Sequence, residues 1–169
     1  LNGAWGSSFS QTIFTPAELN ALGIYEGYIR EMAIEATSNG NYSKNQYLCL
    51  ANTTQATVGV GNIVPDSAFV TCWHNSAEPL SLGVHNFVFD SAFYWDGTSN
   101  LAVMFINSYD ATSGTVATGS SGSTYFRIQT TAANSTVVYY ADNVALTPTS
   151  HTLSNSVAYA KRPAWIFRG

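Results

Sequence analysis

Short runs of β-branched and aromatic residues, separated by clusters of turn-forming residues, recur along most of this chain. Runs of this kind, with no helical patterns alternating between them, favour the strands of an antiparallel sheet. The runs that predict strands are 11–14, 46–51, 68–74, 85–89, 101–107, 125–130 and 136–141. Clear breaks fall at 39–40, 96–97 and 113–123, and we expect the last, rich in Gly, Ser and Thr, to be a mobile loop. The sequence therefore predicts an all-β fold, an antiparallel and jelly-roll-like β-sandwich.

One short helix is predicted near the N-terminus. Thr15 can cap its first turn, Pro16 fits the first helical position, and Glu18 completes a capping box. Gly23 offers a stop, so we expect a helical turn over 16–22.

The segment 28–36 can be interpreted in two ways from its residues. Apolar residues at helical spacing favour a helix, whereas the alternation of apolar and charged residues favours a strand, less cleanly. Glu31 and Glu35 share a face in either case and could imitate the acid and base of a glycosidase. Glycosidase carboxylates, however, flank a bond about 5–9 Å apart within a cleft. We therefore interpret them as two exposed glutamates that flank Ala33 on a solvated strand face.

The composition narrows the class of partner. Charged residues make up only 9% of the 169 residues, and aromatic residues make up 14%, which argues against disorder. The net charge is −4 with six basic residues, so there is no electrostatic footprint for phosphate backbones and we expect no nucleic-acid partner. A neutral surface rich in hydroxyl and amide groups is typical of extracellular β-proteins and of sugar-binding proteins.

The length suits one domain. No apolar run approaches the roughly eighteen residues that span a bilayer, so we expect no membrane insertion. No signal peptide is recognisable, and the chain begins at Leu1 without an initiator Met. We expect residues 1–169 to be a single module excised from a larger secreted or cell-surface protein and tethered to its other modules.

Catalytic and metal-binding patterns are weak. The three histidines belong to neither a Gly-x-Ser-x-Gly elbow nor a His-Glu-x-x-His helix, so we expect a non-catalytic protein without a cofactor. Four aspartates fall at predicted strand ends or turns, where they can hold a structural Ca²⁺ or simply form turns: Asp90, Asp96, Asp110 and Asp142. Cys49 and Cys72 lie in predicted strands and could form one bridge or remain two buried thiols.

Four stretches carry a resemblance to a known class of modules: 10–15 (SQTIFT), 44–53 (KNQYLCLANT), 93–103 (FYWDGTSNLAV) and 159–166 (YAKRPAWI). In this order they resemble β-sandwich modules of large secreted, type IX-exported multimodular proteins of Bacteroidota. The resemblance implies a β-sandwich, a strand over 28–36, and export. It implies no defined activity, although such a module can be a carbohydrate-binding module. The chain departs from the pattern at 69–75, where Cys72, Trp73 and His74 have no counterpart.

Aromatic residues supply the candidate ligand site. The apolar faces of a pyranose stack on Trp and Tyr, while its hydroxyls pair with amide and hydroxyl side chains. Trp73 stands beside His74 and Asn75 in the departing segment, Tyr109 precedes the Gly/Ser-rich loop, and Trp5 lies in a Gly/Ser-rich N-terminal stretch. We predict these five residues as the carbohydrate-binding site, with burial in the core as the alternative for Trp73.

Two further tryptophans, Trp95 and Trp165, lie in segments that match the family pattern, and we expect them in the core. The resulting hypothesis is a non-catalytic module that binds a polysaccharide or other glycan. The rival hypothesis is a structural spacer or adhesin module without a sugar ligand. An exposed tryptophan outside the core, on a groove or a flat face, would favour the first.

Overall fold

Nearly all regular structure in the chain is β-strand. The computed structural model describes residues 7–38, 43–79, 81–108, 125–141, 144–150 and 155–169, without the side chains of 43–44 and 77–79. The elements in chain order are β1 (Ser7–Phe14), α1 (Pro16–Ala21), β2 (Gly27–Ala36), β3 (Ser43–Thr53), the 3₁₀ turn η1 (Asp66–Ala68), β4 (Val70–Pro79), β5 (Gly83–Trp95), β6 (Asn100–Ser108), β7 (Ile128–Thr130), β8 (Thr136–Ala141), β9 (Asn155–Tyr159), β10 (Lys161–Pro163) and β11 (Ile166–Arg168).

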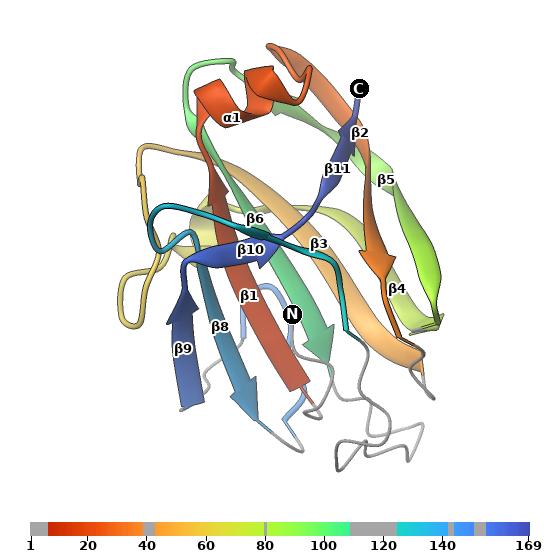
Figure 1. The fold of residues 1–169 in the computed structure, drawn as a ribbon. Coiled ribbons are helices and arrows are strands. Elements are labelled where there is room, and N and C mark those ends of the chain that lie inside the picture. Colours follow the sequence, from red (N-terminus) through yellow and green to blue (C-terminus); the bar gives the residue numbers. More distant parts are fainter. Residues whose placement is uncertain (1–6, 39–42, 80, 109–124, 142–143, 151–154) are drawn as a thin grey trace.

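These strands form two main antiparallel sheets and a small ribbon (Figure 1). The larger sheet has six strands in the order β4-β3-β6-β1-β8-β9, and the smaller has three in the order β11-β2-β5. The ribbon pairs β10 with β7 and crosses in front of the larger sheet. The predicted all-β, antiparallel sandwich is confirmed.

The main core lies between the two sheets. We call the face of the six-stranded sheet that meets the smaller sheet its inner face. From this face Phe14, Leu48 and Phe105 pack against Met32 and Phe87 of the smaller sheet, all of them buried. The inner face therefore holds the largest group of buried apolar side chains.

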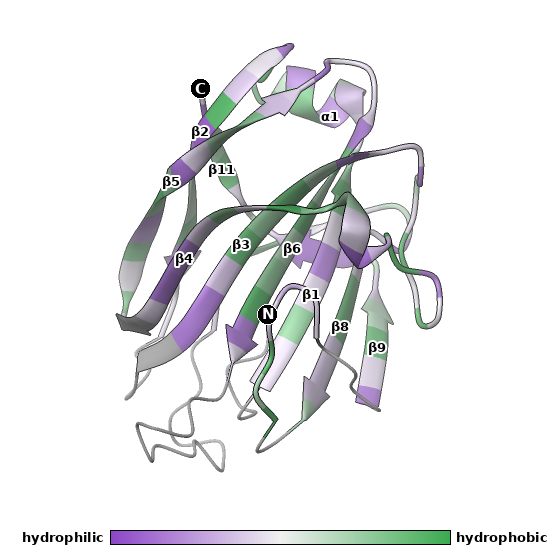
Figure 2. Ribbon diagram, turned by 180° about the vertical axis from the view of Figure 1, so that it is seen from behind, coloured by the Kyte–Doolittle hydropathy of each residue, from purple (hydrophilic) through white to green (hydrophobic). Residues whose placement is uncertain are grey.

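The opposite face of the six-stranded sheet, its back face, is also covered. Ile13 on β1 packs with Val58 and Val64 from the 54–65 connection, and Gln11 fixes Val64 by two hydrogen bonds of 2.8 and 2.9 Å. Because both faces are buried, β6 is apolar along most of its length rather than alternating, as Figure 2 shows.

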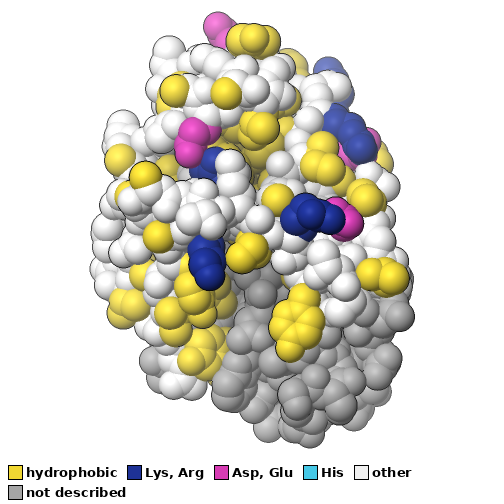
Figure 3. Space-filling model, viewed as in Figure 1, with side chains coloured by type: hydrophobic (Ala, Val, Ile, Leu, Met, Phe, Trp, Pro, Cys, Tyr) yellow, Lys and Arg dark blue, Asp and Glu magenta, His cyan; other side chains and the backbone are white. Residues whose placement is uncertain are grey.

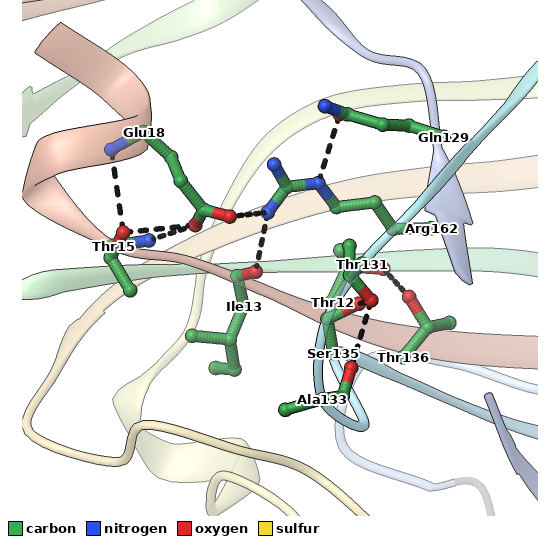
Figure 4. Close-up of polar contacts among 10 residues, drawn as sticks. All are labelled: Thr12, Ile13, Thr15, Glu18, Gln129, Thr131, Ala133, Ser135, Thr136 and Arg162. Atoms are coloured by element: carbon green, nitrogen blue, oxygen red, sulfur yellow. Dashed lines mark hydrogen bonds and ion pairs between the residues drawn. The ribbon is translucent and has the colours of Figure 1, made fainter. Parts of the chain in front are cut away.

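The helix forms where its capping residues predict it. The Thr15 hydroxyl accepts a hydrogen bond from the Glu18 backbone N–H at 3.3 Å, and the Glu18 carboxylate accepts one from the Thr15 N–H at 2.8 Å (Figure 4). The helix ends at Ala21, with Leu22 as its C-cap, so it is one residue shorter than the predicted turn.

The segment 28–36 is a strand, as the resemblance implies and as its residues alone left open. Strand β5 runs from Gly83 to Trp95, well beyond the predicted 85–89, so the expectation that Asp90 lies at a strand end or turn is wrong. The last part of the chain forms three short strands that residue patterns did not predict. The expected loop over 113–123, Asp110 and Asp142 lie outside the described residues.

Cys49 and Cys72 are free, buried thiols. Cys49 packs on the back face with Phe9 and Met104, whereas Cys72 belongs to the core between the sheets. Burial raises the pKa of Cys49 to about 11 and that of Cys72 to about 12, so both act as small apolar side chains at neutral pH.

The turn between β5 and β6 is built by Asp96. Its carboxylate accepts hydrogen bonds from the Ser99 hydroxyl at 2.6 Å, the Ser99 N–H at 2.7 Å and the Thr98 N–H at 2.9 Å. The bonds to Ser99, followed by those to Thr98, lower the pKa of Asp96 to about 2. Because this folded-state pKa lies below the ordinary value, the ionised turn favours the folded state at neutral pH. That contribution is lost as the pH falls from about 4 towards 2.

Gly97 is the residue of this turn that tolerates least change. Its φ of 74° is left-handed, and an added Cβ would lie 2.9 Å from the Glu26 Cβ. We expect Gly97→Ala to lower the free energy of unfolding by at least about 1–2 kcal/mol. Gly59→Ala is the matched control, because that site is open and its φ is not left-handed. Equal urea midpoints for the two variants would show that the Gly97 turn relaxes without cost.

Candidate functional site

Alternation along β4 separates the three predicted neighbours. The Trp73 ring is only 9% exposed and packs edge-on against Phe87 in the core, with ring centroids 4.7 Å apart. His74 is exposed, stacks on Tyr47 at 4.3 Å and hydrogen-bonds Asn45 at 2.8 Å. The expected exposed stacking platform at Trp73 is therefore wrong, because successive strand residues point to opposite faces and cannot form one surface.

The remaining residues of the predicted site have different outcomes. Asn75 pairs in register with Gln46, which places it on the inner face. Trp5 and Tyr109 lie outside the described residues. Trp95 and Trp165 are 0% and 5% exposed, which confirms their expected place in the core.

A row of polar residues crosses one end of the inner face, one residue on each strand. We call it the polar row. In strand order from β9 to β4 it consists of Asn155, Tyr140, Ser8, Asn107, Gln46 and Asn75. The next row on the same face is mostly apolar: Val157, Val138, Ser10, Phe105, Leu48 and Trp73. The inner face thus changes from apolar core to polar side chains along the strands.

A cavity of about 510 Å³ opens at the β8–β9 end of this face. We call it the tyrosine pocket. The described residues that line it are Tyr125, Phe126, Ile128, Thr136, Val138, Tyr140, Tyr159, Lys161, Arg162 and Pro163. The lining comes from β8, the end of β9, and the segments that carry β7 and β10. In Figure 3 hydrophobic side chains gather over this part of the molecule, with a basic side chain among them.

Strand geometry explains which side chains reach the pocket. Thr136, Val138 and Tyr140 alternate along β8 and so share one face, and Tyr159 pairs in register with Thr136. Tyr125 and Tyr159 are 62% and 41% exposed, so their rings are accessible to a ligand. The sequence did not predict these tyrosines as a site. Side chains alternate between two faces along 136–140, but no pattern in the sequence indicates that this strand lies close to Tyr125 and Tyr159.

Arg162 forms a wall of the pocket and is only 3% exposed. Its guanidinium ion-pairs with Glu18 at 3.0 Å and donates to the Ile13 carbonyl at 3.3 Å and to Gln129 at 3.2 Å (Figure 4). The guanidinium also lies over the Phe14 ring. Partial burial raises the pKa of Glu18, but hydrogen bonds from Arg162 and Thr15 outweigh it and the net shift is downward. Arg162 is therefore a structural cation whose charge Glu18 neutralises.

Two amides in the polar row are incompletely satisfied. Gln46 donates from Nε2 to Asn107 Oδ1 at 2.6 Å, and both side chains are buried. Among the residues that the structure describes, Gln46 Oε1 and Asn107 Nδ2 find no hydrogen-bond partner. A buried polar atom without a partner destabilises the fold, so this pair costs more than an apolar pair of the same shape.

Glu31 and Glu35 lie on the solvent face of β2, as predicted, but their side chains are only partly exposed. Both belong to β2, and each is paired with an arginine, Glu31 with Arg168 and Glu35 with Arg127. The hydrogen bond from Arg127 lowers the pKa of Glu35. Within the described ranges, no three His, Cys, Asp or Glu side chains come together as a metal site would require. The same ranges contain no helix long and apolar enough to cross a membrane.

The chain matches no protein-family model, no curated protein and no solved structure. The resemblance to exported Bacteroidota modules therefore stays a prediction.

The positions of Trp73 and His74 can be tested by stability. Truncating a buried indole leaves a cavity, so Trp73→Ala should lower the free energy of unfolding by about 3–5 kcal/mol. His74→Ala, at the next position, should lower it by less than about 1 kcal/mol because the ring is exposed. Guanidinium denaturation measures both variants. A small effect of Trp73→Ala would place the indole outside the core.

The amide pair permits a double-mutant cycle. Gln46→Met or Asn107→Leu alone leaves the other amide buried without its partner, and each should destabilise by about 1–3 kcal/mol. The double variant removes both amides and should be markedly more stable than the sum of the single effects predicts. Additive losses in thermal or urea unfolding would mean that the two amides do not act as a pair.

Proposed function

We propose that this protein is a non-catalytic carbohydrate-binding module that holds a glycan in the tyrosine pocket. The observation that carries the proposal is the convergence of three tyrosines on one cavity: Tyr125, Tyr140 and Tyr159. Its volume of about 510 Å³ lies within the roughly 300–1,000 Å³ of small-ligand sites. The proposal moves the binding site from Trp73 to a different part of the same inner face.

The chemistry of the lining suits a sugar. Tyrosine rings offer apolar faces for the C–H groups of a pyranose, and their hydroxyls can exchange hydrogen bonds with sugar hydroxyls. Tyr140 and Tyr159 stand on paired strands, so little conformational freedom is lost when a ligand binds. Export, attachment to other modules and a place at the cell surface belong to the same proposal and have the support of the sequence resemblance alone.

A structural spacer or adhesin module remains the second candidate. The observation in its favour is an exposed apolar surface on the solvent face of the smaller sheet. Tyr28 and Tyr94 contact each other there, with ring centroids 5.3 Å apart, and are 54% and 45% exposed. Val88 and Ile166 on neighbouring strands are 65% and 43% exposed. Such a patch can meet another module without any sugar.

Two tyrosine substitutions distinguish the candidates. Tyr125→Ala and Tyr159→Ala should each weaken glycan binding about five- to hundredfold, by analogy with the roughly 1–3 kcal/mol lost with an aromatic stacking platform. Tyr28→Ala removes an equally exposed ring outside the pocket and serves as the control. Affinity electrophoresis in polysaccharide gels, followed by calorimetry, measures the loss. The spacer hypothesis is supported if the unmodified protein is retained by no polysaccharide.

A further inference from the structure

The basic side chains of this protein are unequally compensated. Three of the described arginines are ion-paired with glutamates and a fourth lies over a tyrosine ring: Arg162 with Glu18, Arg127 with Glu35, Arg168 with Glu31, and Arg30 over Tyr28 at 5.4 Å. Among the basic side chains that the structure describes, Lys161 alone has neither an ion pair nor a ring contact. An ammonium group without a carboxylate partner retains its full attraction for a ligand anion.

This uncompensated charge lies at the tyrosine pocket. Lys161 is exposed on β10 and lines the cavity, and the residues of the lining that the structure describes include no Asp or Glu. The other lining cation, Arg162, is neutralised by Glu18. The pocket is therefore locally positive on a protein whose net charge is −4. A cation that faces a partly enclosed cavity interacts with a ligand more strongly than one on an open surface.

We infer that the tyrosine pocket selects an acidic sugar unit and that Lys161 binds its anionic group. This inference rests on the proposed function and adds the class of ligand. When a pyranose lies flat on a tyrosine ring, a carboxylate or sulfate ester projects from the edge of the sugar towards the wall of the pocket. Lys161 and Tyr159 both line the pocket. Lysine acts as a point charge and accepts either anion, and we expect a uronate carboxylate.

The experiment compares pairs of polymers that share a backbone and of which only one carries an anionic group. Polygalacturonate and its fully methyl-esterified form share a backbone, but the ester has no carboxylate. Dextran sulfate and dextran provide the same comparison for a sulfate ester. We expect the protein to bind polygalacturonate about tenfold or more tightly than the ester, which corresponds to one charge-assisted contact of roughly 1.4 kcal/mol. The preference should fall as salt rises from about 0.02 to 0.5 M, because the site is partly exposed to solvent.

Variants assign the preference to one residue. Lys161→Ala should reduce the ratio of the two affinities to about one, whereas Lys161→Arg keeps the charge and should retain most of the preference. Arg30→Ala changes the net charge by the same amount on another surface and should leave the ratio unchanged. Calorimetry on the full chain measures each affinity, and circular dichroism confirms that the variants fold.

The outcomes separate this inference from the proposed function. Equal binding of the charged and the uncharged polymer in both pairs overturns the choice of an acidic sugar but not the proposed glycan pocket. An equal loss of preference in Arg30→Ala and Lys161→Ala attributes the effect to bulk charge and also overturns the inference. A preference for dextran sulfate alone that depends on Lys161 supports it and identifies the anion as a sulfate ester. Binding of none of the four polymers overturns both the inference and the proposed function.

Discussion

The aromatic contacts around Phe87 hold the two main sheets together, and the position of the pocket follows from them. Phe87 on β5 meets Trp73, Phe105 and Trp165 at centroid distances of 4.7, 5.8 and 5.9 Å. These contacts bring the three-stranded sheet over β4, β3 and β6. Three strands cannot cover six, and none of the buried residues of this core comes from β8 or β9. The inner face of β8 and β9 is covered by the β7–β10 ribbon instead, and the tyrosine pocket forms between them.

Arg162 connects this core to the pocket. Its guanidinium joins β10 to the first turn of α1 through Glu18. It also joins β10 to β1 through the carbonyl of Ile13, which lies 149 positions before Arg162 in the sequence. Because Glu18 neutralises it, Arg162 can be buried without leaving an unpaired charge in the core. Lys161, the preceding residue on β10, forms no ion pair with any residue that the structure describes. Two adjacent basic residues therefore have different roles: Arg162 is a buried structural cation, and Lys161 gives the pocket its positive charge.

The candidate site shows where reasoning from sequence failed. Trp73, His74 and Asn75 were grouped because they are adjacent, but adjacency in a strand separates side chains onto two faces. Trp73 also lies directly opposite Leu48 in a row that continues into the core. The tyrosines of the pocket come from three segments whose meeting depends on strand order and on the path of the ribbon. Of the three adjacent residues, Trp73 and Asn75 lie on the inner face, but Trp73 is buried in the core and Asn75 lies at the far end of the polar row from the pocket.

Local chemistry in the sequence determined the capped helix at Thr15–Glu18, the turn at Asp96–Gly97 and the β character of most segments. Each of these depends on hydrogen bonds or steric limits among residues close together in the sequence. These interactions act whatever the tertiary structure of the rest of the chain. The strand order, with β1 between β6 and β8, and the burial of Trp73 were decided by tertiary structure, as were the Glu18–Arg162 pair and the shared cavity of three tyrosines. They depend on which pairing of apolar faces buries the most apolar surface over the whole chain. No local pattern of residues shows which of the possible pairings that is.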